Sequence, residues 1–177
     1  MTKKYTFSKY IIDVKDFPKK GIVFKDWTPL MNNARAYKEL IDYLYNKIKN
    51  LEIDVIVSAE SRGFWLGCPL AIKKGIRFIP ARKPRKLPRP VISASFDLEY
   101  GKDTIEITKG DIEKGDRVLV VDDIIATGGT IKAINKLVKQ SGGKLVGCMF
   151  ISSVPGTKGI NQLKKTKIPV FLAIENL

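Results

Sequence analysis

The stretch VVDDIIATGGT, residues 120–130, combines two acids with a turn that can bind a phosphate. An apolar run precedes the turn, and a helical pattern begins near Thr130. Gly128 and Gly129 can adopt backbone angles closed to other residues, so successive N–H groups can point at one centre. The hydroxyls of Thr127 and Thr130 and the helix N-terminus add further attraction for an anion. The turn is not a Walker A loop, because no lysine follows the glycines, and it is not GxGxxG.

Asp122 and Asp123 stand at the entrance of this turn and would repel a polyphosphate pressed against them. They suit a ligand that carries a phosphate at one end and hydroxyls in its middle, such as a ribose 5-phosphate. The carboxylates would accept from the 2′- and 3′-hydroxyls and stabilise positive charge on the ribose ring if the bond at C1 broke. The alternative is an ordinary strand end with a glycine turn. The ordered set of strand, acids, glycines and helix favours the ligand site.

A second polar group follows another apolar run. DVIVSA, residues 54–59, fits a buried strand, and Ser61, Arg62 and Gly63 come soon after its end. Because ligands of α/β proteins bind at the carboxyl ends of strands, these residues can present donors to a diphosphate. The alternative is an ordinary strand-to-helix turn.

Basic residues lie among three prolines in ARKPRKLPRP, residues 81–90. They are Arg82, Lys83, Arg85, Lys86 and Arg89. The prolines disfavour a helix, so we expect a mobile extended loop. Its charges could close over a ligand with several phosphates. A nucleic-acid patch and a plain solvated loop are the alternatives, and the first is weakened because no aromatic residues interleave for base stacking.

The composition limits the classes of catalytic and metal site that the protein can contain. The 177 residues are 44% hydrophobic and 28% charged, which indicates one soluble globular domain. There is no histidine, which excludes imidazole bases, Ser-His-Asp triads and HExxH zinc sites. Cys68 and Cys148 lack metal-ligand spacing, so we expect two small buried side chains in a reducing cytoplasm. No run is long enough to span a membrane, and the first ten residues have no apolar core, so we expect no secretory signal.

The formal net charge is +14, which fits a polyanionic partner or a lysine-rich surface set by genome composition. Many lysines fall where helices should face solvent, as in NKIKN and KKTK. The second explanation is therefore favoured for most of the charge, with the cluster at 82–89 as the exception.

Helical and strand-like segments alternate along the chain. Helices are expected at 34–49, at 63–75 with Gly75 as the stop, and at 131–140. Short apolar runs predict strands; they are DVIVSA, IRFIPA, RVLVV, LVGCMFI and PVFLAI. VISASFDLEY and DTIEIT alternate as a partly exposed antiparallel pair would. This order predicts an α/β fold, a doubly wound and mostly parallel sheet with helices on both faces, and ligands at the carboxyl ends of its strands.

VLVVDDIIATGGT resembles the signature of type I phosphoribosyltransferases, which transfer ribose 5-phosphate from phosphoribosyl diphosphate (PRPP) to a nitrogen. The resemblance implies that Asp122 and Asp123 hold the ribose hydroxyls and that Ala126, Thr127, Gly128, Gly129 and Thr130 hold the 5-phosphate. Ser61, Arg62, Arg82, Lys83 and Lys86 are then expected at the diphosphate.

Three further stretches resemble adenine phosphoribosyltransferases: FPKKGIVFKDWTPL, AESRGFWLG and ASFDLEYGKDTIEI. The first implies a hood over residues 1–33 that reads adenine largely with the backbone of Val23 and Lys25, with Phe24 between them. Lysine replaces the usual arginine at position 25, which leaves the backbone readout intact but cannot reproduce a guanidinium contact.

The second stretch implies a non-proline cis peptide between Glu60 and Ser61. The third implies a flexible catalytic loop over 83–105, with Glu99 as the catalytic acid and Tyr100 as a covering aromatic. The segment SSVPGTKG departs from the family, so no role is assigned to Thr157.

The resemblance implies a single domain over 1–177 that converts adenine and PRPP into AMP and diphosphate. Mg²⁺ is expected to bind mainly through PRPP and water, with no direct protein ligand. A cytoplasmic homodimer without nucleic-acid or membrane partners is expected. One alternative is a phosphoribosyltransferase for hypoxanthine, guanine or xanthine. The other is a PRPP-binding regulator of nucleic acid, although no helix-turn-helix precedes residue 34.

Overall fold

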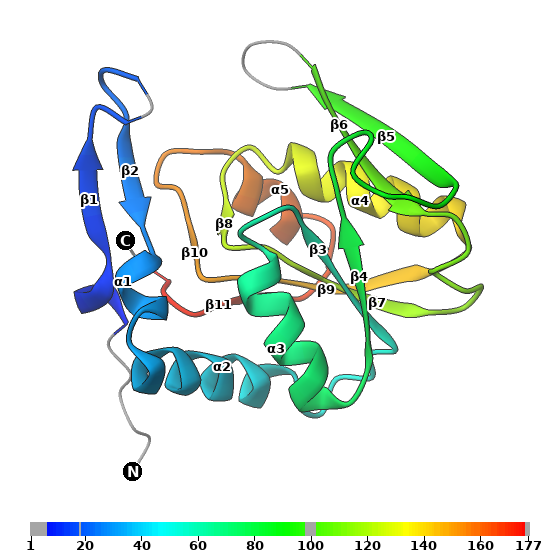
Figure 1. Cartoon of the computed structure of the whole chain (residues 1–177), viewed down its shortest axis with the longest axis horizontal. Coiled ribbons are helices and arrows are strands. Elements are labelled where there is room, and N and C mark those ends of the chain that lie inside the picture. Colours follow the sequence, from blue (N-terminus) through cyan, green and yellow to red (C-terminus); the bar gives the residue numbers. More distant parts are fainter. Residues whose placement is uncertain (1–6, 18, 98–101, 176–177) are drawn as a thin grey trace.

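The computed structural model describes residues 7–17, 19–97 and 102–175 of the chain (Figure 1). A parallel sheet of five strands forms the centre of this described part, in the order β11-β9-β7-β3-β4. The strands are β3 (Val55–Ala59), β4 (Arg77–Ala81), β7 (Arg117–Val121), β9 (Lys144–Phe150) and β11 (Val170–Leu172). All five follow the apolar runs in the sequence, so the predicted α/β sheet is confirmed.

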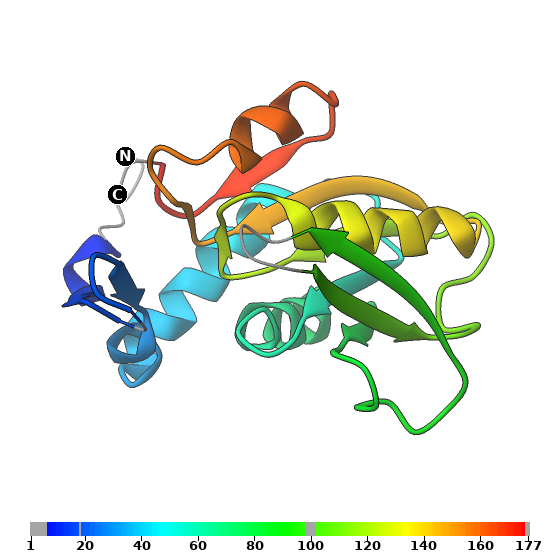
Figure 2. The ribbon, with the colours of Figure 1, turned by 90° about the horizontal axis from the view of Figure 1, so that it is seen from above.

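Helices cover both faces of the sheet, as predicted (Figure 2). One face carries α2 (Ala34–Ile48) and α3 (Phe64–Lys74); the other carries α4 (Gly129–Gln140) and α5 (Gly159–Lys164). The strands alternate between the two layers: Val55 and Val57 pack in the core of α4, whereas Ile56 packs in the core of α2 and α3. Because both faces are covered, these strands are apolar at nearly every position.

The helix boundaries follow from local chemistry. The side chain of Asn33 accepts a hydrogen bond from Ala36 N at 3.0 Å and caps the start of α2. Leu40 and Leu44 are fully buried on its inner stripe, and Tyr37 and Tyr45 lie half-buried beside it. Gly75 ends α3 with a φ of 71°, a left-handed conformation that favours glycine, as the sequence indicated.

An antiparallel hairpin of β5 (Val91–Asp97) and β6 (Lys102–Thr108) packs against α4, which confirms the predicted pair. Several shorter elements were not predicted: the 3₁₀ helix Ser8–Tyr10, β1 (Ile12–Lys15), β2 (Val23–Asp26), α1 (Thr28–Met31), β8 (Ile124–Ile125), β10 (Ser152–Ser153) and α5. β1 and β2 form a hairpin at one side of the sheet (Figure 1), and we call the segment from the 3₁₀ helix to α1 the hood. Phe7, Trp27 and Leu30 fix it to the core of α2 and α3.

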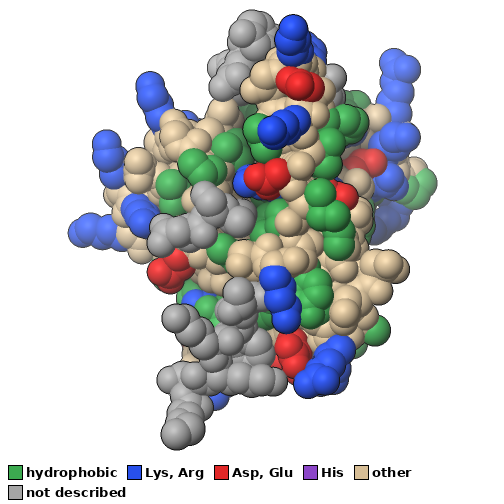
Figure 3. Space-filling model, turned by 90° about the vertical axis from the view of Figure 1, so that its left-hand side faces the viewer, with side chains coloured by type: hydrophobic (Ala, Val, Ile, Leu, Met, Phe, Trp, Pro, Cys, Tyr) green, Lys and Arg blue, Asp and Glu red, His purple; other side chains and the backbone are tan. Residues whose placement is uncertain are grey.

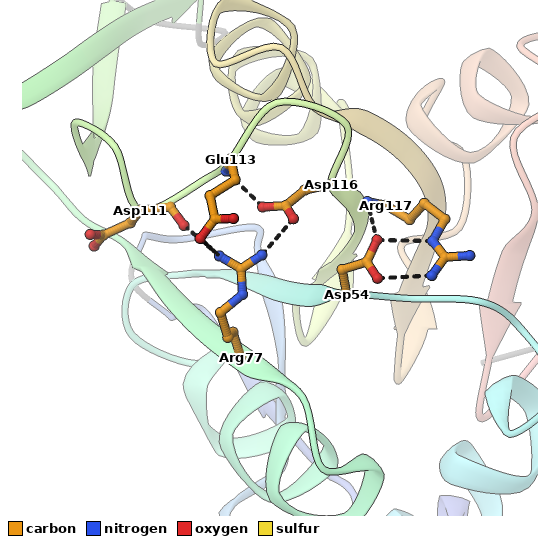
Figure 4. Close-up of polar contacts among 6 residues, drawn as sticks. All are labelled: Asp54, Arg77, Asp111, Glu113, Asp116 and Arg117. Atoms are coloured by element: carbon orange, nitrogen blue, oxygen red, sulfur yellow. Dashed lines mark hydrogen bonds and ion pairs between the residues drawn. The ribbon is translucent and has the colours of Figure 1, made fainter.

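Ion pairs join the amino ends of the central strands (Figure 4). Asp54, just before β3, accepts hydrogen bonds from the backbone N, Nε and Nη2 of Arg117, at 2.8, 2.9 and 2.8 Å. Arg77, at the start of β4, pairs with Asp116 and with Glu113. Hydrogen bonds from Arg117 hold the pKa of Asp54 well below its usual value. These acids are therefore neutralised by charges from neighbouring strands.

Both cysteines are free. Cys148 is buried in β9, and burial raises its pKa to about 12. The prediction that Cys68 is buried was wrong, because its position on α3 leaves it half-exposed. Within the described ranges, no helix is both long and apolar enough to cross a membrane.

Candidate active site

A cavity of about 510 Å³ opens at the carboxyl ends of β3 and β7. These neighbouring strands are where the strand order reverses, since the chain continues from β3 to β4 on one side and from β7 to β9 on the other. The lining residues come from four stretches: Ala59, Glu60 and Arg62 after β3; Lys83; Phe96, Asp103, Thr104 and Ile105; and residues 122–131. The site predicted from the sequence therefore coincides with a cavity at the expected edge of the sheet.

The glycine turn forms one wall of this cavity. Ala126, Thr127, Gly128, Gly129 and Thr130 all line it. Gly128 has a φ of 81°, a left-handed conformation that favours glycine, and α4 begins at the next residue. In the part of the chain that the structure describes, the amides of Thr127 and Gly128 donate to no other protein group. Together with the start of α4, these donors can receive an anion.

Asp122 and Asp123 lie between this turn and β3. Asp122 is partly exposed to the cavity, whereas Asp123 is 3% exposed, and the Asp123 amide donates to Asp122 Oδ1 at 2.9 Å. Burial and the charge of Asp123 raise the pKa of Asp122 well above its usual value. Burial also raises the pKa of Asp123, although Arg62 opposes this. The two acids are thus placed where their charge is costly, unless a ligand satisfies them.

The turn after β3 brings Arg62 to these acids. The Glu60–Ser61 peptide is cis, as the resemblance implied. Arg62 Nε lies 3.0 Å from Asp123 Oδ2, and the guanidinium lies 5.2 Å from the centre of the Phe24 ring in the hood. Arg62 therefore connects the acids to the hood, while Ser61 is exposed and lies outside the cavity lining.

Gly63 allows this turn to fit between two strand ends. A Cβ added at Gly63 would lie 2.8 Å from the carbonyl oxygen of Ala59 and 2.9 Å from that of Val121. Both neighbours are backbone atoms of the central sheet and cannot move aside. Glycine is therefore required where α3 begins above β3 and β7.

The basic segment contributes one lining residue. Lys83 lines the cavity, and its Nζ lies 3.3 Å from Asp103 Oδ2 on β6. Arg82 instead binds Glu60 with two hydrogen bonds of 3.1 Å, and its Nη1 donates to the carbonyl oxygen of Lys86. The Arg82 and Lys86 side chains are not part of the lining. The segment is non-helical, as the prolines predicted.

Each cation closest to the cavity has an acidic partner within the protein. Arg62 pairs with Asp123, Arg82 with Glu60, and Lys83 with Asp103. Glu60 and Asp103 were not predicted as site residues, because each stands in a stretch that reads as an ordinary strand or turn. The signal that could have found Glu60 is its position one residue after β3, at the same edge as Asp122.

The residues expected at the base lie outside the cavity lining. Val23, Phe24 and Lys25 belong to β2, and Lys25 Nζ donates to Asp13 Oδ2 of β1 at 2.8 Å. The predicted catalytic residues Glu99 and Tyr100 lie outside the described residues. Phe96 and Asp103, in the two strands that flank them, line the cavity.

The side of the molecule that carries the hood exposes hydrophobic side chains among lysines and arginines (Figure 3). The large exposed apolar residues of the hood hairpin are Ile12, Val14, Phe17, Ile22 and Val23. Phe17 and Phe24 also pack edge to face, with their ring centres 5.2 Å apart. The hood therefore offers aromatic and aliphatic surface that a flat apolar ligand could contact.

Comparison with known proteins gives consistent matches. The phosphoribosyl transferase domain family matches residues 26–175. An adenine phosphoribosyltransferase of Flavobacterium johnsoniae is 49% identical over 165 residues, covering 93% of this chain and 96% of the relative. The crystal structure of adenine phosphoribosyltransferase from Thermoanaerobacter pseudethanolicus has a TM-score of 0.91 at 39% identity, covering 96% and 98% of the two chains. The enzyme of Saccharomyces cerevisiae, complexed with an imino-altritol bisphosphate and adenine, has a TM-score of 0.87 at 37% identity, covering 95% and 96%.

Proposed function

The chain belongs to the phosphoribosyl transferase family, within its adenine phosphoribosyltransferase branch, and we propose from this that it converts adenine and PRPP into AMP and diphosphate. This is a pentosyl transfer of purine salvage, EC 2.4.2.7. The observation that carries the proposal is the juxtaposition of two neighbouring acids, one buried and one partly exposed, with a glycine turn in one cavity. A phosphate and the hydroxyls of one sugar can be held there at the same time.

The ribose 5-phosphate of PRPP occupies the wall made by the turn. Its phosphate accepts from the amides and hydroxyls of Ala126–Thr130 and from the start of α4. Its 2′- and 3′-hydroxyls donate to Asp122 and Asp123. When the bond from C1 to diphosphate breaks, the sugar ring gains positive charge, and the carboxylates stabilise that charge. Burial raises the pKa values of both acids, so their ionised form is costly while the site is empty of positive charge. Positive charge on the sugar ring would favour that ionised form, which supports this role.

The diphosphate lies toward Arg62 and Lys83, with Ser61, Arg82 and Lys86 around it. Their internal acid partners support an exchange in which phosphate oxygens replace carboxylates. Mg²⁺ would bind mainly through oxygens of PRPP and water, as is usual for magnesium on phosphates. When bound, the ion neutralises charge on the leaving diphosphate.

Adenine binds between the hood and the cavity. The backbone of Val23 and Lys25 offers one acceptor and one donor to the amino group and a ring nitrogen, and Phe24 contacts the ring. The cation–aromatic contact of Arg62 with Phe24 supports this placement, because it already joins the hood to the acids. Glu99 assists proton transfer at the purine, and Tyr100 covers the site.

The proposal includes the larger context of the enzyme. The domain spans 1–177, with the hood over about 1–33 and a flexible catalytic loop over about 83–105. It works as a homodimer in the cytoplasm, with no nucleic-acid or membrane partner. Two free cysteines support a reducing compartment.

The deciding experiment measures product formation from PRPP and Mg²⁺ with adenine, hypoxanthine or guanine in separate reactions. AMP from adenine alone is expected. A product from a 6-oxo purine would keep the PRPP site and overturn the base assignment. PRPP binding without any product would instead favour a regulator. Glu99→Gln should lower turnover by about 100-fold and change adenine binding much less.

A further inference from the structure

A segment outside the predicted site lies directly behind the glycine turn. Ile151 N donates to the carbonyl oxygen of Asp123 at 2.8 Å, and Val154 N donates to that of Ile125 at 2.9 Å. Between these bonds, β10 pairs in parallel with β8. Gly159 N then donates to the carbonyl oxygen of Ala126 at 2.9 Å. We call residues 151–159 the backing segment, because three of its amides bind carbonyl groups of the chain that leads into the turn, from Asp123 to Ala126.

Gly159 lies against the turn with no room for a side chain. It is buried, and a Cβ added to it would lie 2.2 Å from the carbonyl oxygen of Ala126 and 2.9 Å from Gly128 N. Conversely, a Cβ on Gly128 would lie 3.3 Å from Gly159 Cα. Real Cβ atoms essentially never approach another atom within 3.0 Å. Because the atoms on the other side are backbone, any side chain at 159 must displace the turn itself.

We infer that Gly159 is a positioning residue for the 5-phosphate. The absence of a side chain at this position lets the backing segment lie against the turn and fix the direction of its amides. The inference rests on the proposed function, since it takes the turn as the phosphate site. It goes beyond the signature sequence, because Gly159 lies about 30 residues after the turn and does not line the cavity.

The effect of adding a side chain at position 159 should be limited to the 5-phosphate end of the ligand. The diphosphate is assigned to Arg62 and Lys83 and the base to the hood, and none of these residues touches Gly159. A shift of the turn by about 1 Å can cost a catalyst on the order of 100-fold. We therefore expect Gly159→Ala to weaken ligands with a 5-phosphate by at least about tenfold. Ligands without that phosphate should be affected much less.

AMP and adenosine provide the test, because they differ only in the 5′-phosphate. Their affinities for wild-type protein and Gly159→Ala are measured by calorimetry, together with KM for PRPP and kcat. The expected result is a fall of about tenfold or more in the ratio of AMP to adenosine affinity, with KM raised more than kcat is lowered. Gly143→Ala is the matched control. A Cβ there would lie 3.0 Å from Ile112 Cγ2 and 3.2 Å from Val138 Cγ1, in the core at the far end of α4.

The outcomes separate this inference from the proposed function. If wild-type protein does not prefer AMP over adenosine, the turn is not a phosphate site and the proposed function fails. If wild-type protein prefers AMP and Gly159→Ala keeps the same ratio, the positioning role is overturned. Gly143→Ala, whose Cβ would press on core side chains, should leave the ratio unchanged, and a comparable fall of the ratio in this control would also overturn the positioning role.

A second variant guards against failure of Gly159→Ala to fold. Leu163 is 7% exposed and packs α5, which begins at the end of the backing segment, against the core. Leu163→Ala removes this packing, so it weakens the attachment of the backing segment without adding atoms. The ratio of AMP to adenosine affinity should fall in this variant as well. An unchanged ratio in a folded Leu163→Ala protein would also contradict the positioning role.

Discussion

The two ends of the central strands carry the same kinds of side chain and use them in opposite ways. At the amino ends, Asp54 accepts three hydrogen bonds from Arg117, and its pKa is lowered. At the carboxyl ends, Arg62 pairs with Asp123 alone, and burial raises the pKa of both Asp122 and Asp123. β3 and β7 run from one group to the other. The difference therefore comes from pairing and burial, since the acids themselves are identical.

This contrast assigns the acids at the amino ends of the strands to stability and those at the carboxyl ends to function. Acids at the amino ends are satisfied by arginines of other strands of the sheet, so they favour folding. Acids at the carboxyl ends have too few hydrogen-bond and charge partners to offset the cost of their burial. They therefore favour binding of a ligand that supplies those partners. The arrangement fits the general observation that strained or unsatisfied groups concentrate where a protein acts.

The most direct test of this division is to remove one carboxylate charge at each end of the strands. Asp123→Asn should lower kcat/KM for PRPP by about 100-fold, because it removes a carboxylate from a developing positive charge. Asp54→Asn is the matched control and should leave activity per folded molecule unchanged. AMP formation and thermal unfolding are measured on both. Equal activity in the two variants would contradict the division between the ends.

Lysines test the same division with a smaller expected effect. Lys83 lines the cavity, whereas Lys144 is exposed at the amino end of β9. Lys83→Met should raise KM for PRPP and weaken inhibition by diphosphate by about tenfold, the cost of one bond to a charged group. Lys144→Met carries the same change of charge at the other end and should alter neither value. A similar effect from both variants would indicate that net charge acts at long range, without a local diphosphate site.

The sequence predicted what depends on local pattern. β3 and β7 are short β-branched runs, and Gly128 stands where the turn needs a positive φ, so both were found. The hairpin of the hood was missed, because Ile12 and Val23 are exposed and the strands show no alternation in burial.

Tertiary contacts explain the other omissions. Lys83 and Asp103 pair across 20 residues, and Gly159 meets Ala126 across 33 residues. Neither contact leaves a periodic signal in the sequence, since each depends on how separate elements pack. The candidate site was therefore predicted where a continuous motif carries it and missed where the second partner comes from elsewhere in the fold.

At the amino ends, stability should depend on Arg117. Arg117→Met removes two of the three hydrogen bonds to Asp54, those from Nε and Nη2, and keeps the one from the backbone N, so it should lower Tm at pH 7 by about 2–4 °C. The pKa of folded Asp54 is lowered, so its contribution is present above the unfolded pKa of about 3.9 and is lost as pH falls through the folded value. The Tm difference between variant and wild type should therefore shrink below about pH 4. A difference that persists unchanged at lower pH would assign the effect to packing of the arginine stem.

The carboxyl ends should show the opposite sign. Asp122→Asn removes a buried charge that repels Asp123, so it should raise Tm at pH 7 by about 1–3 °C while lowering activity. The pKa of folded Asp122 is raised, so wild-type stability is fully present below the unfolded pKa of about 3.9 and is lost as pH rises through the folded value. The gain in Tm should thus be absent near pH 4 and grow toward neutral pH, the reverse of the Arg117→Met profile. Thermal unfolding from pH 4 to 8 measures both profiles. A variant that is less stable than wild type at every pH would mean that Asp122 stabilises the fold. Acids at both ends would then be stabilising, and the two ends would differ only in the size of that contribution.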